Sequence, residues 1–334
     1  MIFFDTTKIS ESSDVEVLKE VKKRKITHVF HDIDGTHSLI REWQPVMSRV
    51  LNDVIEKGLP QGYDSDENIN KMIDSCGIEP LPETDNFCIE SAGLSALTQM
   101  EWSIRRAVEE GNISKELLGL TENDLKVNSE IVKRIYKGEE LFDEFSEPEK
   151  FKSFLRENTP KLFKAYEKVL NGFCRDKNLQ LAKENPDRFL VKGSKEFMQL
   201  LFENGAKNYF VTGAVVDTTT PKPMGMYEEV LALGFEIGEG KTVEAICGST
   251  WTEKIPKEEV MKRLCKENNI NPENVLVVGD GRSEIFAGSE MGAAIISRLP
   301  EEAKRQRELH KELGADIIVS DFASGEFEKL WIFD

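Results

Sequence analysis

The chain has 334 residues, of which 39% are hydrophobic and 31% are charged, and its formal net charge at pH 7 is −17. This length is sufficient for two domains, one of them with a sizeable core. The negative charge argues against a general nucleic-acid or anionic-membrane surface, because both reward basic patches. It leaves room for a small phosphorylated substrate, because a metal ion and one or two buried cations reverse the field locally.

The N-terminus and the cysteines favour the cytoplasm. Residues Met1–Asp5 turn acidic too early for a signal peptide, and no apolar run approaches the roughly 18 residues that span a bilayer. The five cysteines have no metal-ligand spacing, and their odd number argues against a disulfide framework. We therefore expect a cytoplasmic protein that binds neither nucleic acid nor membrane, while its oligomeric state does not follow from the sequence.

Residues 10–25 predict an amphipathic helix that ends just before the first strand. The next stretch is a short apolar run that stops at two carboxylates, Asp32 and Asp34, in a D-x-D-G-T pattern. Both carboxylates are expected to lean into a crevice beyond the carboxyl end of a buried strand, where open α/β sheets bind ligands. Asp32 is expected to be an exposed carboxylate that contributes little to the core. His31 and His37 flank this motif, and a structural hydrogen bond is the role expected for each.

Between Glu42 and about Pro186 the sequence changes character. It becomes rich in Glu, Lys, Leu and Asn, with helical periodicity and few β-branched runs. Helices are predicted over 96–108, 131–141 and 161–170. This segment is therefore expected to be a separate, mostly helical insertion.

After the insertion, strands and helices alternate. A helix is predicted from Ser194 onward, followed by a strand that ends in Thr212 and Gly213. Further strands are predicted over 243–247, 274–278, 293–296 and 316–319. Alternation at this spacing implies βαβ units and a parallel sheet. The predicted fold is α/β, with a Rossmann-like parallel-sheet core from residues 1–42 and 187–334 and a helical domain from residues 43–186.

Two further motifs carry charge. The strand predicted over 274–278 runs into an acidic turn with Asp280 and Glu284, in the pattern G-D-x-x-x-E. Lys254 lies 26 residues before Asp280, in a Lys-Ile-Pro segment where the helix leading to this strand begins.

Taken in order, these motifs resemble those of the haloacid dehalogenase-like hydrolases, most of which are magnesium-dependent phosphotransferases. The resemblance rests on the motif of Asp32, on Thr212 followed by Gly213, on Lys254, and on the last acidic motif, in which Glu284 replaces the commoner Asp. It implies that the insertion forms a helical cap over the active site. The cap is larger than the usual four-helix bundle, and the sequence does not account for its extra length.

The resemblance also implies a role for each acidic residue. Asp32 would attack phosphorus and form an aspartyl-phosphate. Asp34 would protonate the leaving group and then deprotonate the attacking water. Mg²⁺ would be held by Asp32, the backbone carbonyl of Asp34, Asp280 and Glu284, the last of these directly or through water.

The remaining motif residues would bind the phosphoryl group. Thr212 and the amides near Gly213 would hold its oxygens, and Lys254 would offset the repulsion between the phosphate and the clustered carboxylates. Gln99, Arg105 and Arg106, on a helix predicted within the cap, are the candidates for substrate specificity.

An Asp two residues after the nucleophile points to phosphatases and phosphomutases within this family. We expect a phosphatase acting on a small phosphomonoester, because that activity is the commoner one, and a phosphomutase of the β-phosphoglucomutase type is the alternative. Two other hypotheses are a catalytically dead binding module that kept the fold and a phosphoprotein phosphatase that uses its cap for docking.

Overall fold

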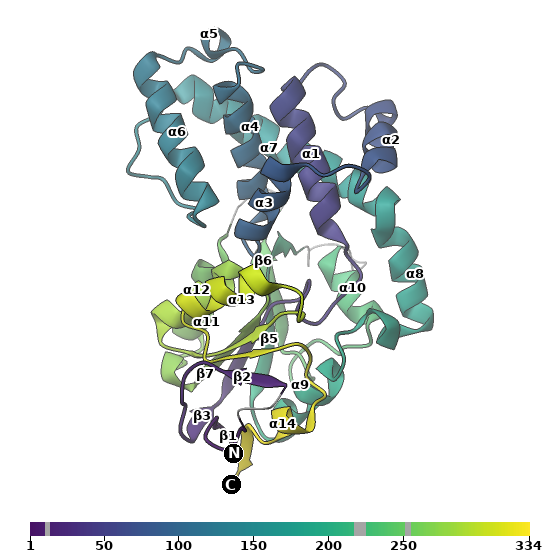
Figure 1. Cartoon of the computed structure of the whole chain (residues 1–334), viewed down its shortest axis with the longest axis vertical. Coiled ribbons are helices and arrows are strands. Elements are labelled where there is room, and N and C mark those ends of the chain that lie inside the picture. Colours follow the sequence, from purple (N-terminus) through teal and green to yellow (C-terminus); the bar gives the residue numbers. More distant parts are fainter. Residues whose placement is uncertain (11–13, 217–224, 251–254) are drawn as a thin grey trace. The chain divides into compact units, whose positions relative to one another are not determined.

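The computed structural model describes residues 1–10, 14–216, 225–250 and 255–334. Its contacts divide the chain into two compact units. The α/β unit comprises residues 1–40 and 179–334, and the helical unit comprises residues 41–178 (Figure 1). The domain bounds drawn from the sequence, at 42–43 and 186–187, remain predictions.

A seven-stranded sheet forms the centre of the α/β unit, in the order β2-β9-β8-β7-β4-β5-β6. Its neighbouring strands are parallel, except that β2 runs antiparallel to β9 at one edge. A smaller antiparallel sheet has the order β10-β1-β3. The predicted α/β fold with a parallel sheet is therefore confirmed. The strands are β1 (Ile2–Phe4), β2 (Val15–Val17), β3 (Arg24–Ile26), β4 (His28–His31), β5 (Lys207–Val215), β6 (Ala245–Ser249), β7 (Val275–Gly279), β8 (Ala294–Arg298), β9 (Ile317–Val319) and β10 (Trp331–Phe333).

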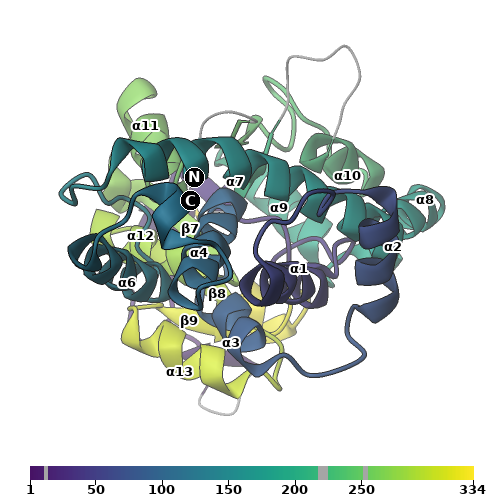
Figure 2. The ribbon, with the colours of Figure 1, turned by 90° about the horizontal axis from the view of Figure 1, so that it is seen from above.

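Alternate residues of the central strands face two different layers. Val29 of β4 packs in the same core cluster as Phe197 and Leu201 of α9 and as the small sheet. Phe30, the next residue, packs with Val260 of α11 and Ala287 of α12 on the other face. Figure 2 shows α9 on the opposite side of β7 from α11 and α12. The helices of this unit are α9 (Ser194–Glu203), α10 (Met226–Ala232), α11 (Lys257–Glu267), α12 (Arg282–Met291), α13 (Lys304–Glu312) and α14 (Gly325–Glu328), with short 3-10 turns at Pro186–Phe189 and Pro272–Asn274.

The helical unit is built around α4, which packs against α1, α6 and α7. In its core the rings of Phe87 and Trp102 stack with their centroids 3.7 Å apart. The helices predicted over 96–108 and 161–170 are found, whereas the one predicted over 131–141 ends at Tyr136. The helices are α1 (Trp43–Lys57), α2 (Asp66–Ser75), α3 (Pro82–Glu90), α4 (Ala96–Glu109), α5 (Lys115–Leu118), α6 (Glu122–Tyr136) and α7 (Glu149–Leu170), followed by a π-helical turn at Asn171–Arg175 and by α8 (Asp176–Glu184), which crosses into the α/β unit. In the described part of the chain, no helix combines the length and the apolar character needed to cross a membrane.

The prediction of an amphipathic helix over residues 10–25 is wrong. The described residues of this segment form the strands β2 and β3 instead. Val15 and Val17 are β-branched, which favours a strand over a helix, and they pair with β9. The change from acidic to basic residues along the segment suggested a helix. Pairing with β9 and β1 makes these residues strands instead.

The order of the strands brings the sequence motifs together. From β4 the chain proceeds to β5 and β6 on one side, and then returns to β7 on the other side of β4. In open α/β sheets the crevice at such a reversal, beyond the carboxyl ends of the strands, is where ligands bind. The residues that follow β4 and β7 and those at the end of β5 therefore share one edge of the sheet.

Candidate active site

Asp32 directly follows β4, and its backbone N–H donates to the Val278 carbonyl of β7 at 2.8 Å. The side chain of Asp32 is only 7% exposed, so the expectation of an exposed carboxylate is wrong. Its Oδ1 atom accepts a hydrogen bond from Nζ of Lys257 at 2.7 Å. The same ammonium group donates to Oε2 of Glu284 at 3.0 Å. Asp32 and Glu284 are thus joined by one buried cation.

The lysine that the structure places in this cluster is Lys257, whereas the sequence argument chose Lys254. Lys254 lies outside the described residues. A signal for Lys257 was present, because it shares the buried face of α11 with Val260, Met261 and Leu264 at helical spacing. A lysine within an apolar stripe needs a buried anionic partner, because an unpaired buried charge is costly.

Asp280 follows β7 and lies against the turn after β4. Its Oδ1 atom accepts a hydrogen bond from Oγ1 of Thr36 at 2.9 Å. Gly35 has a φ of +80°, and a Cβ atom there would lie 2.1 Å from Oδ2 of Asp280. Only glycine satisfies both the left-handed backbone and this close approach. The D-x-D-G-T turn therefore packs directly on the carboxylate of the last motif.

Glu284 is fully bound within the protein. Its Oε1 atom accepts from the Gly281 N–H at 2.6 Å, and its Oε2 atom accepts from Lys257 and from the Ser283 hydroxyl, each at 3.0 Å. A Cβ atom on Gly279 would lie 2.2 Å from Cγ of Glu284. The absence of a side chain at residue 279 therefore makes room for the longer acid that replaces the commoner Asp.

The three carboxylates of Asp32, Asp280 and Glu284 each offer an oxygen atom, and these atoms lie within 4.8 Å of one another. Burial raises the pKa of Asp280 well above its ordinary value, and the charges of Asp32 and Glu284 raise it further. Burial also raises the pKa of Asp32, against the attraction of Lys257. Asp32 and Glu284 are buried and Asp280 is partly buried. Among the described residues one ammonium group faces these three carboxylates, whose formal charges leave an excess of two. Hard oxygen ligands with this charge fit a divalent cation such as Mg²⁺.

Glu284 differs from its two neighbours in its pKa. Burial acts to raise it, but the charge and the hydrogen bond of Lys257 outweigh burial and lower it. Glu284 is therefore the carboxylate of the cluster that most readily stays ionised next to Lys257.

Thr212, Gly213 and Asp34 lie on the adjoining segments of this edge. Thr212 and Gly213 belong to β5, the parallel neighbour of β4, and the Thr212 hydroxyl accepts from the Ala214 N–H at 3.1 Å. Asp34 lies in the turn after β4, which is closed by a hydrogen bond from the Gly35 N–H to the Ser38 carbonyl at 2.9 Å. The structure thus places each described residue of the sequence motifs at the carboxyl edge.

His31 and His37 form a buried hydrogen-bonded pair, with Nδ1 of His31 2.9 Å from Nε2 of His37. The outer nitrogen atoms of the pair contact Asn208 at 3.1 Å and Ser194 at 3.0 Å. Burial lowers the pKa of His31 to about 4 and that of His37 well below its ordinary value, so both rings are neutral near pH 7. These contacts agree with the structural role expected for both residues.

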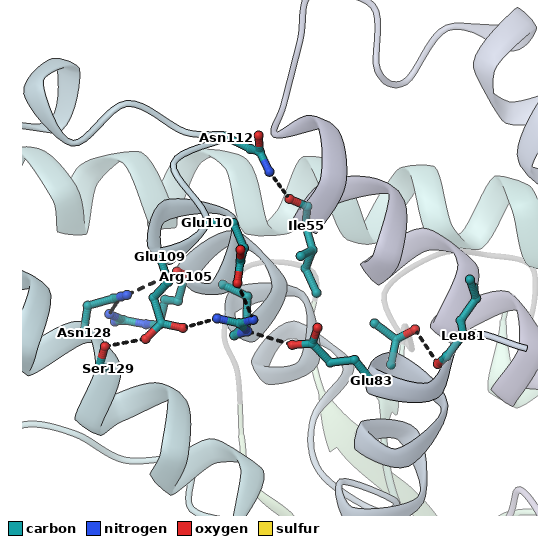
Figure 3. A network of polar contacts seen from close by, with 11 residues as sticks. Ile55, Leu81, Glu83, Arg105, Glu109, Glu110, Asn112, Asn128 and Ser129 are labelled. Carbon is teal, nitrogen blue, oxygen red and sulfur yellow. Dashed lines mark hydrogen bonds and ion pairs between the residues drawn. The ribbon is translucent and has the colours of Figure 1, made fainter.

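Arg105 of the helical unit is a structural residue. Its Nη1 and Nη2 atoms donate to the two carboxylate oxygens of Glu147 at 2.6 and 2.9 Å, and Nε donates to Glu101 at 2.9 Å. Nη1 also donates to Oδ1 of Asn128 at 3.1 Å, and Nδ2 of Asn128 donates to the Arg105 carbonyl at 3.1 Å (Figure 3). This bidentate geometry joins α4 to α6 and to the segment before α7.

Arg106 and Gln99 are also bound within the helical unit. Gln99 donates from Nε2 to the Ser91 hydroxyl at 2.9 Å. Arg106 donates to the carboxylates of Glu83, Glu109 and Glu110 (Figure 3). These contacts favour a role in holding α3 and α4 together over the role in specificity suggested by the sequence.

Comparison with known proteins gives a match to one family. Residues 226–297, from α10 to β8, match the sequence model of the haloacid dehalogenase-like hydrolases. The matched region contains Lys257, Asp280 and Glu284. The resemblance seen in the motifs is thereby confirmed for this region. No curated protein matches the sequence.

Solved structures that resemble the chain include a predicted phosphatase from Clostridium acetobutylicum, with 12% identity over 92% of this chain and 99% of that one and a TM-score of 0.48. A β-phosphoglucomutase from Clostridium difficile has 14% identity over 91% of this chain and 96% of that one, with a TM-score of 0.42. A predicted phosphoglycolate phosphatase from Haemophilus somnus has 15% identity over 89% and 95%, with a TM-score of 0.42.

Proposed function

Because residues 226–297 match the haloacid dehalogenase-like hydrolases, we propose a function that is found in that family. The protein is a Mg²⁺-dependent phosphatase that hydrolyses a small phosphomonoester through an aspartyl-phosphate on Asp32. The observation that carries this proposal is the buried cluster in which Lys257 joins Asp32 to Glu284, with Asp280 alongside. A solvent-exposed cluster of acids would cost little, whereas enclosing Asp32 and Glu284 around one ammonium group, with Asp280 partly buried beside them, is costly for stability. That cost is expected at a functional site.

Asp32 is the nucleophile in this proposal. One of its carboxylate oxygens forms a bond to phosphorus while the bond from phosphorus to the ester oxygen breaks, and water later cleaves the aspartyl-phosphate. Lys257 supports this role in two ways. Its charge favours the ionised form of Asp32 against burial, and its hydrogen bond to Oδ1 fixes the orientation of the carboxylate.

Mg²⁺ would be held by Asp32, Asp280 and the backbone carbonyl of Asp34, with Glu284 contributing directly or through water. When bound, the ion would neutralise the charge on the phosphoryl oxygens. Thr36 supports this assignment, because its hydroxyl donates to Oδ1 of Asp280 and so fixes the orientation of that carboxylate.

Asp34 is the proposed general acid and base, and Thr212 and Gly213 are the proposed donors to the phosphoryl oxygens. Asp34 would give its proton to the departing ester oxygen and then take one from the attacking water. The position of Thr212 on the strand beside β4 supports its role, because its hydroxyl and the neighbouring amides lie at the same sheet edge.

The helical unit is the proposed cap. Its insertion in the sequence directly after the first motif supports this role, because a segment at that point is connected to the residues that follow Asp32. A cap that closes over the site excludes water and bulky molecules, so the proposed partner is a small phosphorylated metabolite rather than a phosphoprotein. A cytoplasmic location also stays a prediction, with which the five free thiols agree.

The test is hydrolysis of p-nitrophenyl phosphate by the purified full-length chain. Activity should be lost in EDTA and restored by Mg²⁺, and Asp280→Asn should weaken activation by Mg²⁺ at least about tenfold. Asp187→Asn is the matched control, because its side chain is 85% exposed in the same unit. Full activity in chelator, or equal activation of the Asp280→Asn variant and the wild type, would contradict the proposal. A panel of small phosphate esters then identifies the substrate class.

A further inference from the structure

Arg298 lies at the carboxyl end of β8 and reaches the turn that follows β4. Its Nη1 atom donates to the Gly35 carbonyl at 2.8 Å, and its Nε atom donates to the Ser320 carbonyl at 2.9 Å. Since β7 lies between β8 and β4, this side chain spans the width of the strand that precedes Asp280. The contact joins two segments that are 263 residues apart in the sequence.

With Arg298 in place, both backbone polar groups of Gly35 are bound. Its N–H donates to the Ser38 carbonyl at 2.9 Å, and its carbonyl accepts from Arg298. The carboxylate of Asp280 occupies the space in which a Cβ atom of residue 35 would lie, and the φ of Gly35 is +80°. Because rotation about this φ turns the preceding peptide group, these contacts set the direction of the Asp34 carbonyl.

We propose that Arg298 is a positioning residue for the nucleophile turn. By holding the Gly35 carbonyl, it fixes the peptide between Gly35 and Thr36, while the Gly35 N–H bond to Ser38 holds the peptide between Asp34 and Gly35. With both peptides held, the turn keeps the Asp34 carbonyl in the orientation proposed for metal binding. The inference rests on the proposed function, in which the Asp34 carbonyl is a ligand of Mg²⁺. Arg298 itself touches neither the ion nor the phosphoryl group in this proposal.

Arginine suits this position because its guanidinium presents several donors in one plane. Two of them bind two backbone carbonyls at once, one on the nucleophile turn and one after β9. A lysine ammonium is a single point donor on a flexible stem and cannot reproduce this planar geometry. Burial lowers the pKa of Arg298, but Asp280, Asp321 and Glu302 oppose that shift.

Arg24 provides a matched control. It also binds two backbone carbonyls, donating from Nε to Glu273 at 2.7 Å and from Nη2 to Gly292. These two residues precede β7 and β8, so Arg24 lies at the amino edge of the sheet, away from the carboxylate cluster. Loss of Arg24 should therefore destabilise the α/β unit without changing the site.

The experiment measures Mg²⁺ binding by titration calorimetry, thermal melting, and hydrolysis of p-nitrophenyl phosphate for the wild type, Arg298→Met, Arg298→Lys and Arg24→Met. Arg298→Met should weaken Mg²⁺ binding roughly tenfold and lower kcat by about 10- to 100-fold, the range typical of residues that orient metal ligands. Arg298→Lys should fall between Arg298→Met and the wild type. Arg24→Met should melt earlier but bind Mg²⁺ as the wild type does.

Wild-type Mg²⁺ affinity and kcat in Arg298→Met would overturn the inference, even if that variant melts earlier. Should Arg298→Met fail to fold, Arg298→Lys decides, because unchanged Mg²⁺ affinity in that variant would also overturn it. Failure of the proposed function gives a different pattern. In that case the wild type itself neither binds Mg²⁺ nor hydrolyses the ester, and both proposals fall together.

Discussion

Arg105 in the helical unit and Lys257 in the α/β unit both have side chains only 2% exposed, and both are bound to carboxylates. Arg105 spreads several donors over Glu101, Glu147 and Asn128, and its two acidic partners reach partly into solvent. Lys257 offers a single nitrogen atom to two fully enclosed carboxylates, with Asp280 as a third nearby.

The two clusters differ in how deeply the carboxylates around the cation are buried. Around Arg105 the two carboxylates, Glu101 and Glu147, lie at a partly solvated rim. Around Lys257 the described residues leave a formal excess of two negative charges, and the enclosure of Asp32 and Glu284 makes this excess costly. A buried cation whose acidic partners are partly solvated stabilises a fold, whereas a cation outnumbered by enclosed carboxylates indicates a place for further positive charge.

The largest effect expected is that of Asp32→Asn on turnover. Without the proposed nucleophile the protein should lose roughly 10⁴-fold or more in kcat on p-nitrophenyl phosphate. Thermal stability should stay close to that of the wild type, because the amide still accepts a hydrogen bond from Lys257 while the crowding of like charges falls. The control is Glu101→Gln in the Arg105 cluster, which should keep its turnover. An Asp32→Asn variant that retains most of its activity would contradict the assigned nucleophile.

Lys257→Met should lower kcat by about 10²- to 10³-fold, as loss of one preorganised electrostatic contact does. In chelator it should also lose about 3–5 kcal/mol of stability, because its buried carboxylates are left without a partner. Urea unfolding should show that saturating Mg²⁺ restores part of this stability. If Mg²⁺ restores nothing, the cluster does not accept a divalent cation.

Arg105→Met should give the opposite pattern. Loss of the buried guanidinium should cost the helical unit about 3–5 kcal/mol, since Glu147 loses a bidentate partner. Mg²⁺ should not restore this loss, and the folded fraction should hydrolyse p-nitrophenyl phosphate as the wild type does. Urea unfolding with and without Mg²⁺ measures both points, and restoration by Mg²⁺ would remove the contrast between the two clusters.

The two units should also differ in their response to acid. All four histidines belong to the α/β unit, and burial lowers the pKa of His310 from 6.5 to about 4. Between these two pKa values His310 is protonated in the unfolded chain but stays neutral in the folded chain. Stability therefore falls by about 1.4 kcal/mol for each pH unit as the pH drops from 6.5 toward 4, for this residue alone.

Hydrogen exchange at pH 7 and pH 5, corrected for the intrinsic rates, locates this loss. Protection should fall in peptides of the α/β unit and be kept in the helical unit. The His310→Gln variant should lose less protection between pH 7 and pH 5 than the wild type does. The raised pKa of Asp280 acts in the opposite direction, because it favours folding as the pH falls. Since Asp280 is present in both proteins, comparing them removes its contribution. An equal loss of protection in both units would refute this account.

The acidic motifs were predictable from sequence, because each follows a short buried strand and the carboxyl ends of parallel strands share one edge. Lys257 was harder to find. It is joined to Asp32 by tertiary packing across 225 residues, and Lys254 fitted the local pattern better. The strands β2 and β3 were missed because their partners, β9 and β1, lie elsewhere in the chain. Arg298 carries no local motif at all, and only the order of the strands shows its contact with Gly35.

The position of β4 also determines the order in which the protein is assembled. This central strand leaves the ribosome early, but both of its neighbours, β5 and β7, are made only from residue 207 onward. Meanwhile the helical unit is complete by residue 178, and its contacts lie within one contiguous stretch of chain. Local helical contacts form faster than distant strand pairings. We therefore expect the segment inserted into the α/β unit to fold before its host, while β4 waits unpaired for most of synthesis.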